Sequence, residues 1–183
     1  MSSEKIIQHC APTLAGIKTA NLFNEFFDNE DELLAEIERF NKTFNCCGLR
    51  MVLIALQNKR ALIYVYRVQD LKNDFNNCLS KELLAKYGYD STDILTSIER
   101  LSIRIEDQKE FPHEIGLFLG YPPEDVKGFI DNGGKNYKSL GYWKVYGDEK
   151  KANQTFEKYR ECQRILLDRL KKGYSLKQLV IQK

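Results

Sequence analysis

The sequence predicts an α+β fold in which a small, mostly antiparallel sheet is packed by several helices. Two apolar runs at about 49–56 and 61–66 are separated by a polar tetrapeptide, and this pattern predicts a β-hairpin. A third strand is expected at about 142–146. Much of the remaining chain repeats apolar residues every three or four positions, which is typical of amphipathic helices. Many helices with few strands favour the α+β class.

Helices in the first half of the chain are placed by their capping signals. Thr13 is expected to cap a helix that continues to about Phe27. Asp70 is expected to cap a later helix, which Gly88 would end. The helices predicted in this half cover about 13–27, 30–44, 70–87 and 90–105.

Proline and glycine organise the second half of the chain. Two short helices are expected, one over 113–119 and one that begins at Pro123, because proline favours the first helical position. A long helix is predicted over about 148–172, and Gly173 would close it. The tail at 175–183 fits either a helix or a strand.

Length and composition favour a globular protein with one domain over 1–183. Hydrophobic residues make up 43% of the chain and charged residues 30%, which is typical of globular proteins. The net charge is only +2 and no basic block stands out, so no nucleic-acid partner is expected. The longest apolar runs are too short to span a bilayer, so no membrane partner is expected.

The five cysteines and the N-terminus indicate a cytoplasmic location. The residues that follow Met1 include no apolar stretch of the kind found in signal peptides. Cysteines in a chain without an export signal are usually reduced thiols. No pair has Cys-x-x-Cys spacing, and the adjacent Cys46 and Cys47 suit neither a structural zinc site nor an ordinary disulfide. The sequence therefore predicts no metal site, and it indicates no particular cofactor.

Two short segments collect the uncommon residues of the chain. Residues 111–134 hold three of the four prolines, five of the eleven glycines and one of the two histidines. Residues 9–18 hold the remaining proline and histidine. Such residues prescribe the local chain path, so we expect a ligand site at these segments. The candidate ligand-binding residues are His9, Cys10, Thr13, Lys18, Arg67, His113, Tyr121 and Lys144.

Cys10 is a candidate nucleophile or redox group. A thiol just before the expected helix start would feel the positive end of the helix dipole, which favours the thiolate. Lys18 could add positive charge, and His9 or His113 could act as a base. Adjacent side chains of an extended chain point apart, so His113 is at least as suitable as His9. The alternative is a buried cysteine with a packing role.

His113 and Glu114 form the second candidate pair for catalysis. A histidine beside a carboxylate could transfer protons. In the alternative interpretation, Pro112 opens a helix, Glu114 complements its dipole and His113 packs or caps. Arg67 and Lys144 end two expected strands, where they could bind an anion or simply be solvated charges.

Four motifs resemble a known family. They read His-Cys-Ala-Pro-Thr-Leu-Ala-Gly-Ile-Lys at 9–18, Tyr-Val-Tyr-Arg at 64–67, Pro-His-Glu-Ile-Gly-Leu-Phe-Leu-Gly-Tyr-Pro-Pro-Glu-Asp-Val at 112–126, and Tyr-Trp-Lys-Val-Tyr at 142–146. In these motifs the chain resembles a family of uncharacterised single-domain bacterial proteins, a domain of unknown function found mainly in anaerobes. The resemblance implies a single-domain cytosolic protein and assigns no catalytic residue.

Three functions stay open, and the sequence does not decide whether the protein is an enzyme. The preferred one is a small-ligand or cofactor-binding protein, whose 9–18 and 112–123 segments bind a small molecule or an anion. The second is a protein-interaction module that docks a protein partner through 111–134. It requires an exposed apolar patch, formed by Leu117, Phe118, Tyr121 and Phe129. The third is a thiol-dependent enzyme in which Cys10 has a depressed pKa.

Overall fold

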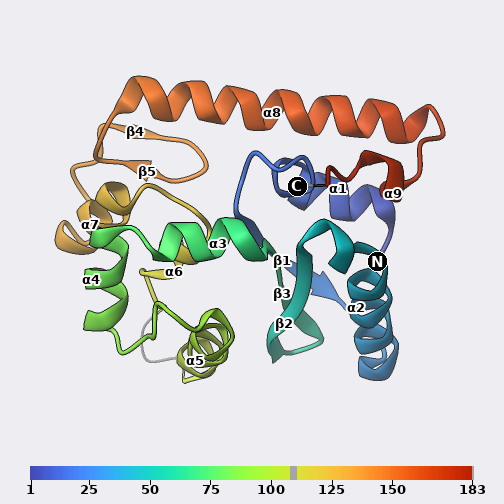
Figure 1. The fold of residues 1–183 in the computed structure, drawn as a ribbon, viewed down its shortest axis with the longest axis horizontal. Coiled ribbons are helices and arrows are strands. Elements are labelled where there is room, and N and C mark those ends of the chain that lie inside the picture. Colours follow the sequence, from blue (N-terminus) through green and yellow to red (C-terminus); the bar gives the residue numbers. More distant parts are fainter. Residues whose placement is uncertain (108–110, 183) are drawn as a thin grey trace. The chain divides into compact units, whose positions relative to one another are not determined.

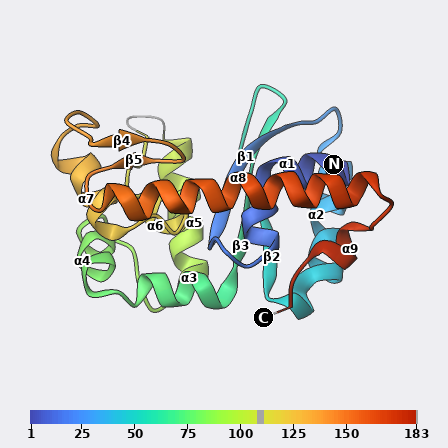
Figure 2. The ribbon, with the colours of Figure 1, turned by 90° about the horizontal axis from the view of Figure 1, so that it is seen from above.

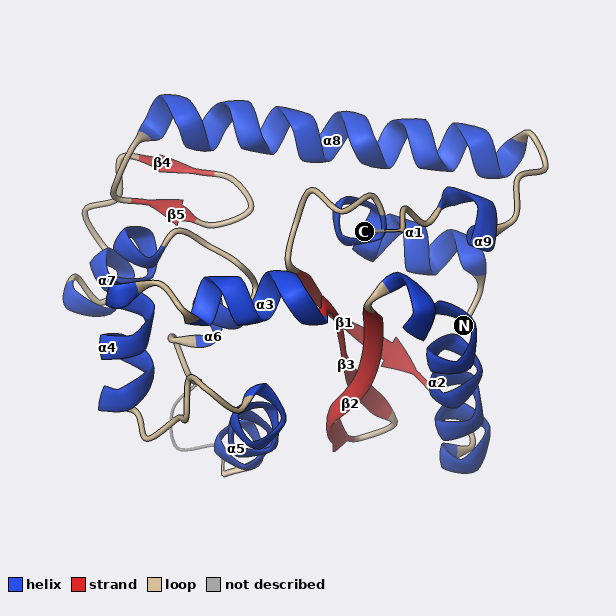
Figure 3. Cartoon of the chain, viewed as in Figure 1, coloured by secondary structure: helices blue, strands red, loops and turns tan. Residues whose placement is uncertain are grey.

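The structure is a computed structural model that describes residues 1–107 and 111–182, and it confirms the α+β class (Figures 1 and 3). Its strands form one three-stranded and one two-stranded sheet. The chain divides into two compact units. Unit 1 consists of Met1–Gln69 with Tyr159–Lys183, and unit 2 consists of Asp70–Lys158. The chain passes from one unit to the other inside two helices, α3 (Val68–Phe75) and α8 (Glu149–Lys171).

Unit 1 is built around the three-stranded antiparallel sheet, whose strand order is β1-β3-β2. The predicted hairpin is confirmed, and its turn residues Asn58 and Lys59 both have positive φ angles, 49° and 60°. Of its two strands, β3 is central and β2 lies at an edge of the sheet. The other elements of unit 1 are α1 (Ser3–Leu14), β1 (Ala20–Phe26), α2 (Glu30–Phe44), the 3-10 helix η1 (Asn45–Cys47), β2 (Leu49–Gln57), β3 (Arg60–Arg67) and α9 (Leu176–Leu179).

The predicted helix over 13–27 is wrong, because a helix ends and a strand begins inside that range. Helix α1 ends at Leu14, and Gly16 then adopts a left-handed φ of 69°. The following residues pair with β3 as strand β1. Pro12 lies inside α1, where it cannot donate to the carbonyl oxygen of Gln8. The side chain of Gln163 donates to that oxygen instead.

Unit 2 is mostly helical and carries the two-stranded sheet. Phe118 lies in its core, with ring-centroid distances of 5.0 Å to Phe75 and 5.2 Å to Tyr89. Figure 2 shows the β4–β5 hairpin beside the start of α8. The rings of Phe156, in α8, and Trp143 have their centroids 4.5 Å apart. The elements of unit 2 besides the α3 and α8 segments are α4 (Cys78–Lys86), α5 (Ile94–Glu106), α6 (Ile115–Phe118), α7 (Pro123–Asp131), β4 (Ser139–Leu140) and β5 (Lys144–Val145).

Two expectations for unit 2 needed correction in detail. The single helix expected over 70–87 is divided into α3 and α4, because Asn77 caps a new helix by accepting from Leu79 N at 2.9 Å. The strand expected at 142–146 is shorter, and it pairs with β4 instead of joining the larger sheet. The third strand of that larger sheet is β1. Pro123 is the first residue of α7, as predicted.

Among the helices of the described residues, none has both the length and the apolar character that crossing a membrane requires.

Candidate functional site

Unit 2 contains an apolar pocket of about 290 Å³. Its walls come from the segment around α6, the turn that precedes α7, one face of α7, and the β4–β5 connection. Five of the nine lining residues have aromatic rings. The lining residues are Phe111, His113, Ile115, Gly116, Tyr121, Asp125, Val126, Phe129 and Trp143.

Glycine and proline bring α6 and α7 close enough to form this pocket. A Cβ atom at Gly116 would lie only 2.7 Å from Cγ2 of Val126 and 3.2 Å from Cδ2 of Tyr121. Gly120 follows α6 with a left-handed φ of 70°, and Pro123 then starts α7. The compositional signal at 111–134 therefore marks a tight turn between two short helices, with a pocket on one side.

Asp125 fixes the position of Trp143 in the pocket wall. This carboxylate is 3% exposed and accepts hydrogen bonds from three donors. Nε1 of Trp143 donates to Oδ2 at 2.7 Å, and the backbone N–H groups of Tyr146 and Gly147 each donate to Oδ1 at 2.7 Å. The carboxylate thus joins the first turn of α7 to the residues on both sides of β5.

Tyr121 stacks on Trp143 at a centroid distance of 4.8 Å. Its hydroxyl donates to the carbonyl oxygen of Tyr142 at 3.1 Å. Burial raises the pKa of Tyr121 to about 12, so its side chain is a neutral phenol at physiological pH. The wall formed by these two rings is therefore uncharged.

His113 and Phe111 border the opening of the pocket, since both line it and both are exposed. The His113 ring lies 4.9 Å from the Phe129 ring. The neighbouring Glu114 points elsewhere and is 1% exposed. It accepts from the Tyr89 hydroxyl at 2.8 Å and forms an ion pair with Nε of Arg104 at 2.9 Å. Only the histidine of the predicted pair therefore faces the pocket.

Glu114 has a structural role in the core of unit 2. Burial, followed by the hydrogen bond to Glu114, raises the pKa of Tyr89. The phenol therefore stays protonated and keeps donating to the carboxylate.

The thiol of Cys10 lies in a different environment from the one that the sequence suggested. Cys10 sits inside α1 instead of before a helix start, and it is fully buried. Burial raises its pKa to about 12, although the charge of Lys18 acts in the opposite direction. The predicted depressed pKa is therefore wrong, and the thiol-enzyme hypothesis loses its physical basis.

The other candidates of 9–18 make contacts within unit 1. The hydroxyl of Thr13 donates to Oδ1 of Asn21 at 2.7 Å. Lys18 is 5% exposed and its ammonium donates to the carbonyl oxygen of Ala20. Burial lowers the pKa of Lys18 to about 7. His9 is exposed and stacks on Phe23 with a centroid distance of 4.8 Å.

Arg67 binds backbone carbonyl groups from three parts of unit 1. Its side chain is almost fully buried. Nε donates to Thr13 O at 2.7 Å, and Nη2 donates to Leu14 O at 2.8 Å and to Ile181 O at 2.9 Å. Nη1 donates to Cys47 O at 3.2 Å. The observed role of Arg67 is to hold these segments together.

Lys144 ends up in the other sheet, in unit 2. Its ammonium donates to Gly134 O at 2.7 Å, and it lies over the rings of Phe129 and Tyr137 at 5.5 and 5.0 Å. Arg67 and Lys144 thus belong to different sheets and different units. The same holds for the 9–18 and 112–123 segments. Of the predicted site residues, His113 and Tyr121 meet in the pocket.

The exposed patch that the interaction hypothesis requires is absent at two of its four residues. Leu117 is 2% exposed and Phe118 is fully buried, so the prediction for these two side chains is wrong. Tyr121 and Phe129 are half-buried and line the pocket.

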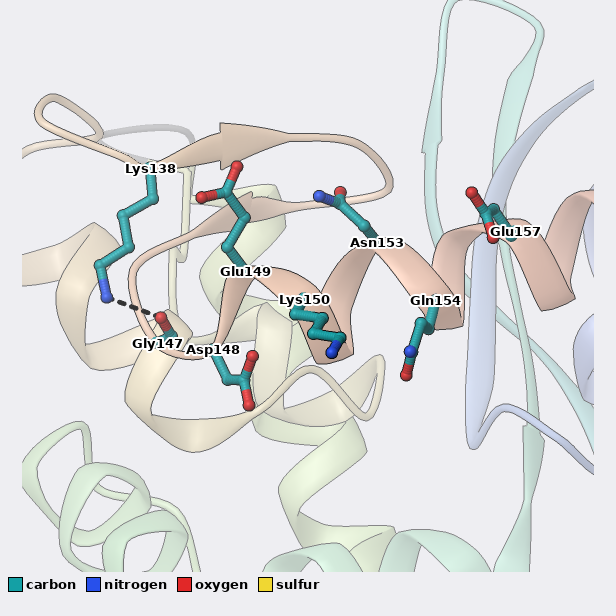
Figure 4. A pocket seen from close by; sticks show the side chains of 8 residues that line it. All are labelled: Lys138, Gly147, Asp148, Glu149, Lys150, Asn153, Gln154 and Glu157. Atoms are coloured by element: carbon teal, nitrogen blue, oxygen red, sulfur yellow. Dashed lines mark hydrogen bonds between the residues drawn. The ribbon is translucent and has the colours of Figure 1, made fainter.

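A second, open depression of about 720 Å³ lies at the start of α8 (Figure 4). Its lining is polar and carries charges of both signs, and Lys138 points to the carbonyl oxygen of Gly147, 2.7 Å away. No group of three or more potential metal ligands occurs among the described residues. This depression has the character of an ordinary solvated surface.

Sequence reasoning missed Asp125 and Val126 as residues of a site. Asp125 gave no local signal, because its three donors come from residues about twenty positions further along the chain. Trp143 offered a weak signal as the only tryptophan of the chain.

Fold and pocket together define an α+β protein with an aromatic cavity inside one compact unit. The chain belongs to the family described as Protein of unknown function (DUF3793), which matches residues 6–180. This confirms the resemblance to a family without an assigned function. No curated protein and no solved structure matches the chain.

Proposed function

We propose that this protein binds a small ligand in the aromatic pocket of unit 2. The observation that carries the proposal is a cavity of about 290 Å³ with five aromatic rings in its wall. Pockets for small molecules are concave and mostly apolar, with a few polar groups, and this volume is close to the lower end of their usual range. Of the two segments proposed from the sequence, this site uses 112–123 and not 9–18. Helix α7 and Trp143 supply further walls of the pocket.

The chemistry of the wall favours a neutral, planar ligand. Nε1 of Trp143 and the hydroxyl of Tyr121 already donate within the protein. Asp125 accepts three hydrogen bonds, so a cationic ligand would compete with donors that are already in place. Aromatic rings provide large flat surfaces for stacking. The imidazole of His113 at the opening could contact one polar group of the ligand.

The experiment uses Trp143 as an intrinsic reporter. It is the only tryptophan, and it lines the pocket, so its fluorescence reports occupancy. Benzamide, benzoate and benzylamine serve as probes because they differ mainly in charge. We expect benzamide to bind more tightly than the two charged probes. A fragment of about nine heavy atoms that gains about 0.5 kcal/mol per atom would have a Kd of about 0.5 mM.

Phe111→Ala is the matching variant, and Phe26→Ala is its control. The two side chains are 55% and 64% exposed, so neither substitution should disturb a core, but only Phe111 lines the pocket. Loss of one aromatic contact should weaken benzamide binding about fivefold in the Phe111 variant, and leave it unchanged in the control. Absence of any fluorescence response, or equal effects of both substitutions, would reject the pocket as the binding site.

We also infer a cytoplasmic location. The five cysteines are all free and are distributed over both units, which fits a reducing compartment. The measurement is the distribution of the tagged full-length chain between cytoplasmic and other cell fractions.

A further inference from the structure

The adjacent cysteines of η1 hold their sulfur atoms unusually close together. The Sγ atoms of Cys46 and Cys47 are 3.8 Å apart. Side chains of neighbouring residues in a helix normally point in different directions. Here one thiol is exposed and the other is buried, and both are reduced. The pair therefore presents two convergent thiols, of which Cys46 is directly accessible.

The backbone around the pair is held by several contacts within unit 1. Nη1 of Arg67 donates to the carbonyl oxygen of Cys47 at 3.2 Å. The side chain of Gln182 forms a hydrogen bond with the Cys47 thiol. Gly48 ends η1 with a left-handed φ of 71°. Ordering of the pair before a ligand arrives reduces the entropic cost of chelation.

The distance between the sulfur atoms selects the kind of ligand. Two metal–sulfur bonds of about 2.3 Å at a tetrahedral angle span about 3.8 Å, and at a right angle they span about 3.3 Å. Zinc would need further protein ligands, and no group of three or more His, Cys, Asp or Glu residues converges among the described residues. A centre that needs only two thiolate ligands therefore fits the Cys46–Cys47 pair better than zinc does.

We propose that Cys46 and Cys47 form a dithiol site that chelates a trivalent arsenical or a similar thiophilic centre with two open positions. With an organic arsenoxide, two S–H bonds and the As=O bond break, and two As–S bonds form. The two protons leave with the oxygen as one water molecule, so no electrons are transferred. Cys46 reacts first because it is exposed, and Cys47 then closes the ring.

The site differs chemically from the other cysteines. Cys78 is also exposed, but it has no sulfur partner among the described contacts, so it can form only a single As–S bond. A chelate gains from the high effective concentration of its second thiol. Phenylarsine oxide therefore distinguishes the pair from a lone thiol, whereas an alkylating reagent would modify Cys46 and Cys78 alike.

The test treats the reduced full-length protein with one equivalent of phenylarsine oxide. Native mass spectrometry should show one phenylarsenic group per chain. Trypsin cleaves after Lys42 and Arg50, so both cysteines lie in the 43–50 peptide, which contains no other cysteine. We expect the group on this peptide. The dithiol 2,3-dimercaptopropanol should remove the phenylarsenic group. A monothiol at the same thiol concentration should leave the group in place.

Cys46→Ser is the decisive variant because this exposed side chain is outside the core. It should weaken phenylarsine oxide binding on the order of 100-fold, through loss of the chelate. Cys78→Ser is the matched control and should bind like the wild type. Cys47→Ser should match Cys46→Ser, provided that its thermal unfolding shows a folded chain. A wild-type chain without the adduct, an adduct on another peptide, or full binding by Cys46→Ser would overturn the proposal.

Discussion

Arg67 adds side-chain donors at the end of α1, where Thr13 O also accepts from Gly16 N and Leu14 O from Ile181 N, both at 3.1 Å. The last carbonyl groups of a helix have no partners within the helix. In α1 these include the carbonyls of Thr13 and Leu14, and Arg67 donates to both. The rigid, forked guanidinium suits this task better than a lysine ammonium would. The sequence indicated only a charge at a strand end, because the acceptors come from distant segments.

Cys10 shows why a local dipole argument failed. The expected thiolate depended on a helix that starts at Thr13, whereas the actual helix starts at Ser3. Cys10 therefore lies inside α1, away from its first turn, and burial has the largest effect on the pKa of its thiol. The position of a helix start decides the sign of such an effect, and one misplaced boundary reverses it.

Lys18 leads to a prediction for the pH dependence of stability. Its folded-state pKa of about 7 lies below the ordinary value of 10.5, so between these pH values the unfolded chain binds more protons here. Stability should therefore rise with pH across this range. Cys10 acts in the opposite direction above pH 9. Its pKa of about 12 exceeds the ordinary 9.0, so the unfolded chain loses this proton first and stability falls.

The expected net result is a rise of the unfolding free energy by about 2 kcal/mol between pH 7 and pH 9, with no further gain above that. Urea unfolding at a series of pH values measures it. Lys18→Met should remove the rise, and Lys42→Met, at an exposed position of α2, should preserve it. A slope that survives in Lys18→Met would show that another group is responsible.

At the scale of elements, Asp125 connects α7 to the strand β5. The two elements are far too short to be stable separately, and this carboxylate links them through three hydrogen bonds. It also holds Trp143 against the pocket. The shape of the pocket thus depends on a polar contact between two elements as well as on apolar packing.

Asp125→Asn tests this connection. An amide offers one acceptor oxygen in place of two, and its NH₂ group would face existing donors. We expect unit 2 to lose about 2 kcal/mol of stability, and the Trp143 emission to shift to longer wavelength as the ring becomes hydrated. The neighbouring Glu124→Gln is the control, since Glu124 is exposed. Equal emission spectra for both variants would contradict the assigned role.

Elements with strong local signals were predicted well from the sequence. Helix α2 covers 30–44 as expected, because its apolar period and its Asn29 cap agree. The hairpin and the Pro123 start of α7 were also visible locally. Strand β1 was not, because its spacing also fits a helix and only pairing with β3 decides the outcome. The pocket could be located near 112–123, but its walls from α7 and Trp143 depend on packing that the sequence does not display.

At the scale of the whole molecule, we propose that residues 1–183 behave as one cooperative domain. Two helices, α3 and α8, run through the boundaries between the two compact units. Because α3 and α8 each have residues in both units, unfolding of one unit would also unwind part of a helix of the other.

Arg67→Met provides the test. Removal of the guanidinium takes away four hydrogen bonds to backbone carbonyls of unit 1, which should cost about 3 to 5 kcal/mol. Trp143 fluorescence reports on unit 2, and circular dichroism reports on all helices. In a cooperative chain, both signals should shift together to the same lower midpoint. Arg60→Met, at the exposed start of β3, is the control. A fluorescence midpoint that stays at its wild-type value would instead define two independent domains.

The discontinuity of unit 1 has a consequence for synthesis on the ribosome. The first 69 residues emerge early, but their core also includes Leu166, Leu179 and Val180. At ordinary translation rates, the intervening Asp70–Lys158 segment takes roughly 5 to 20 seconds to make. During that interval the nascent sheet lacks the tail side chains that complete its core. The N-terminal part of the protein is thus completed last, and it is the part that a chaperone would need to protect.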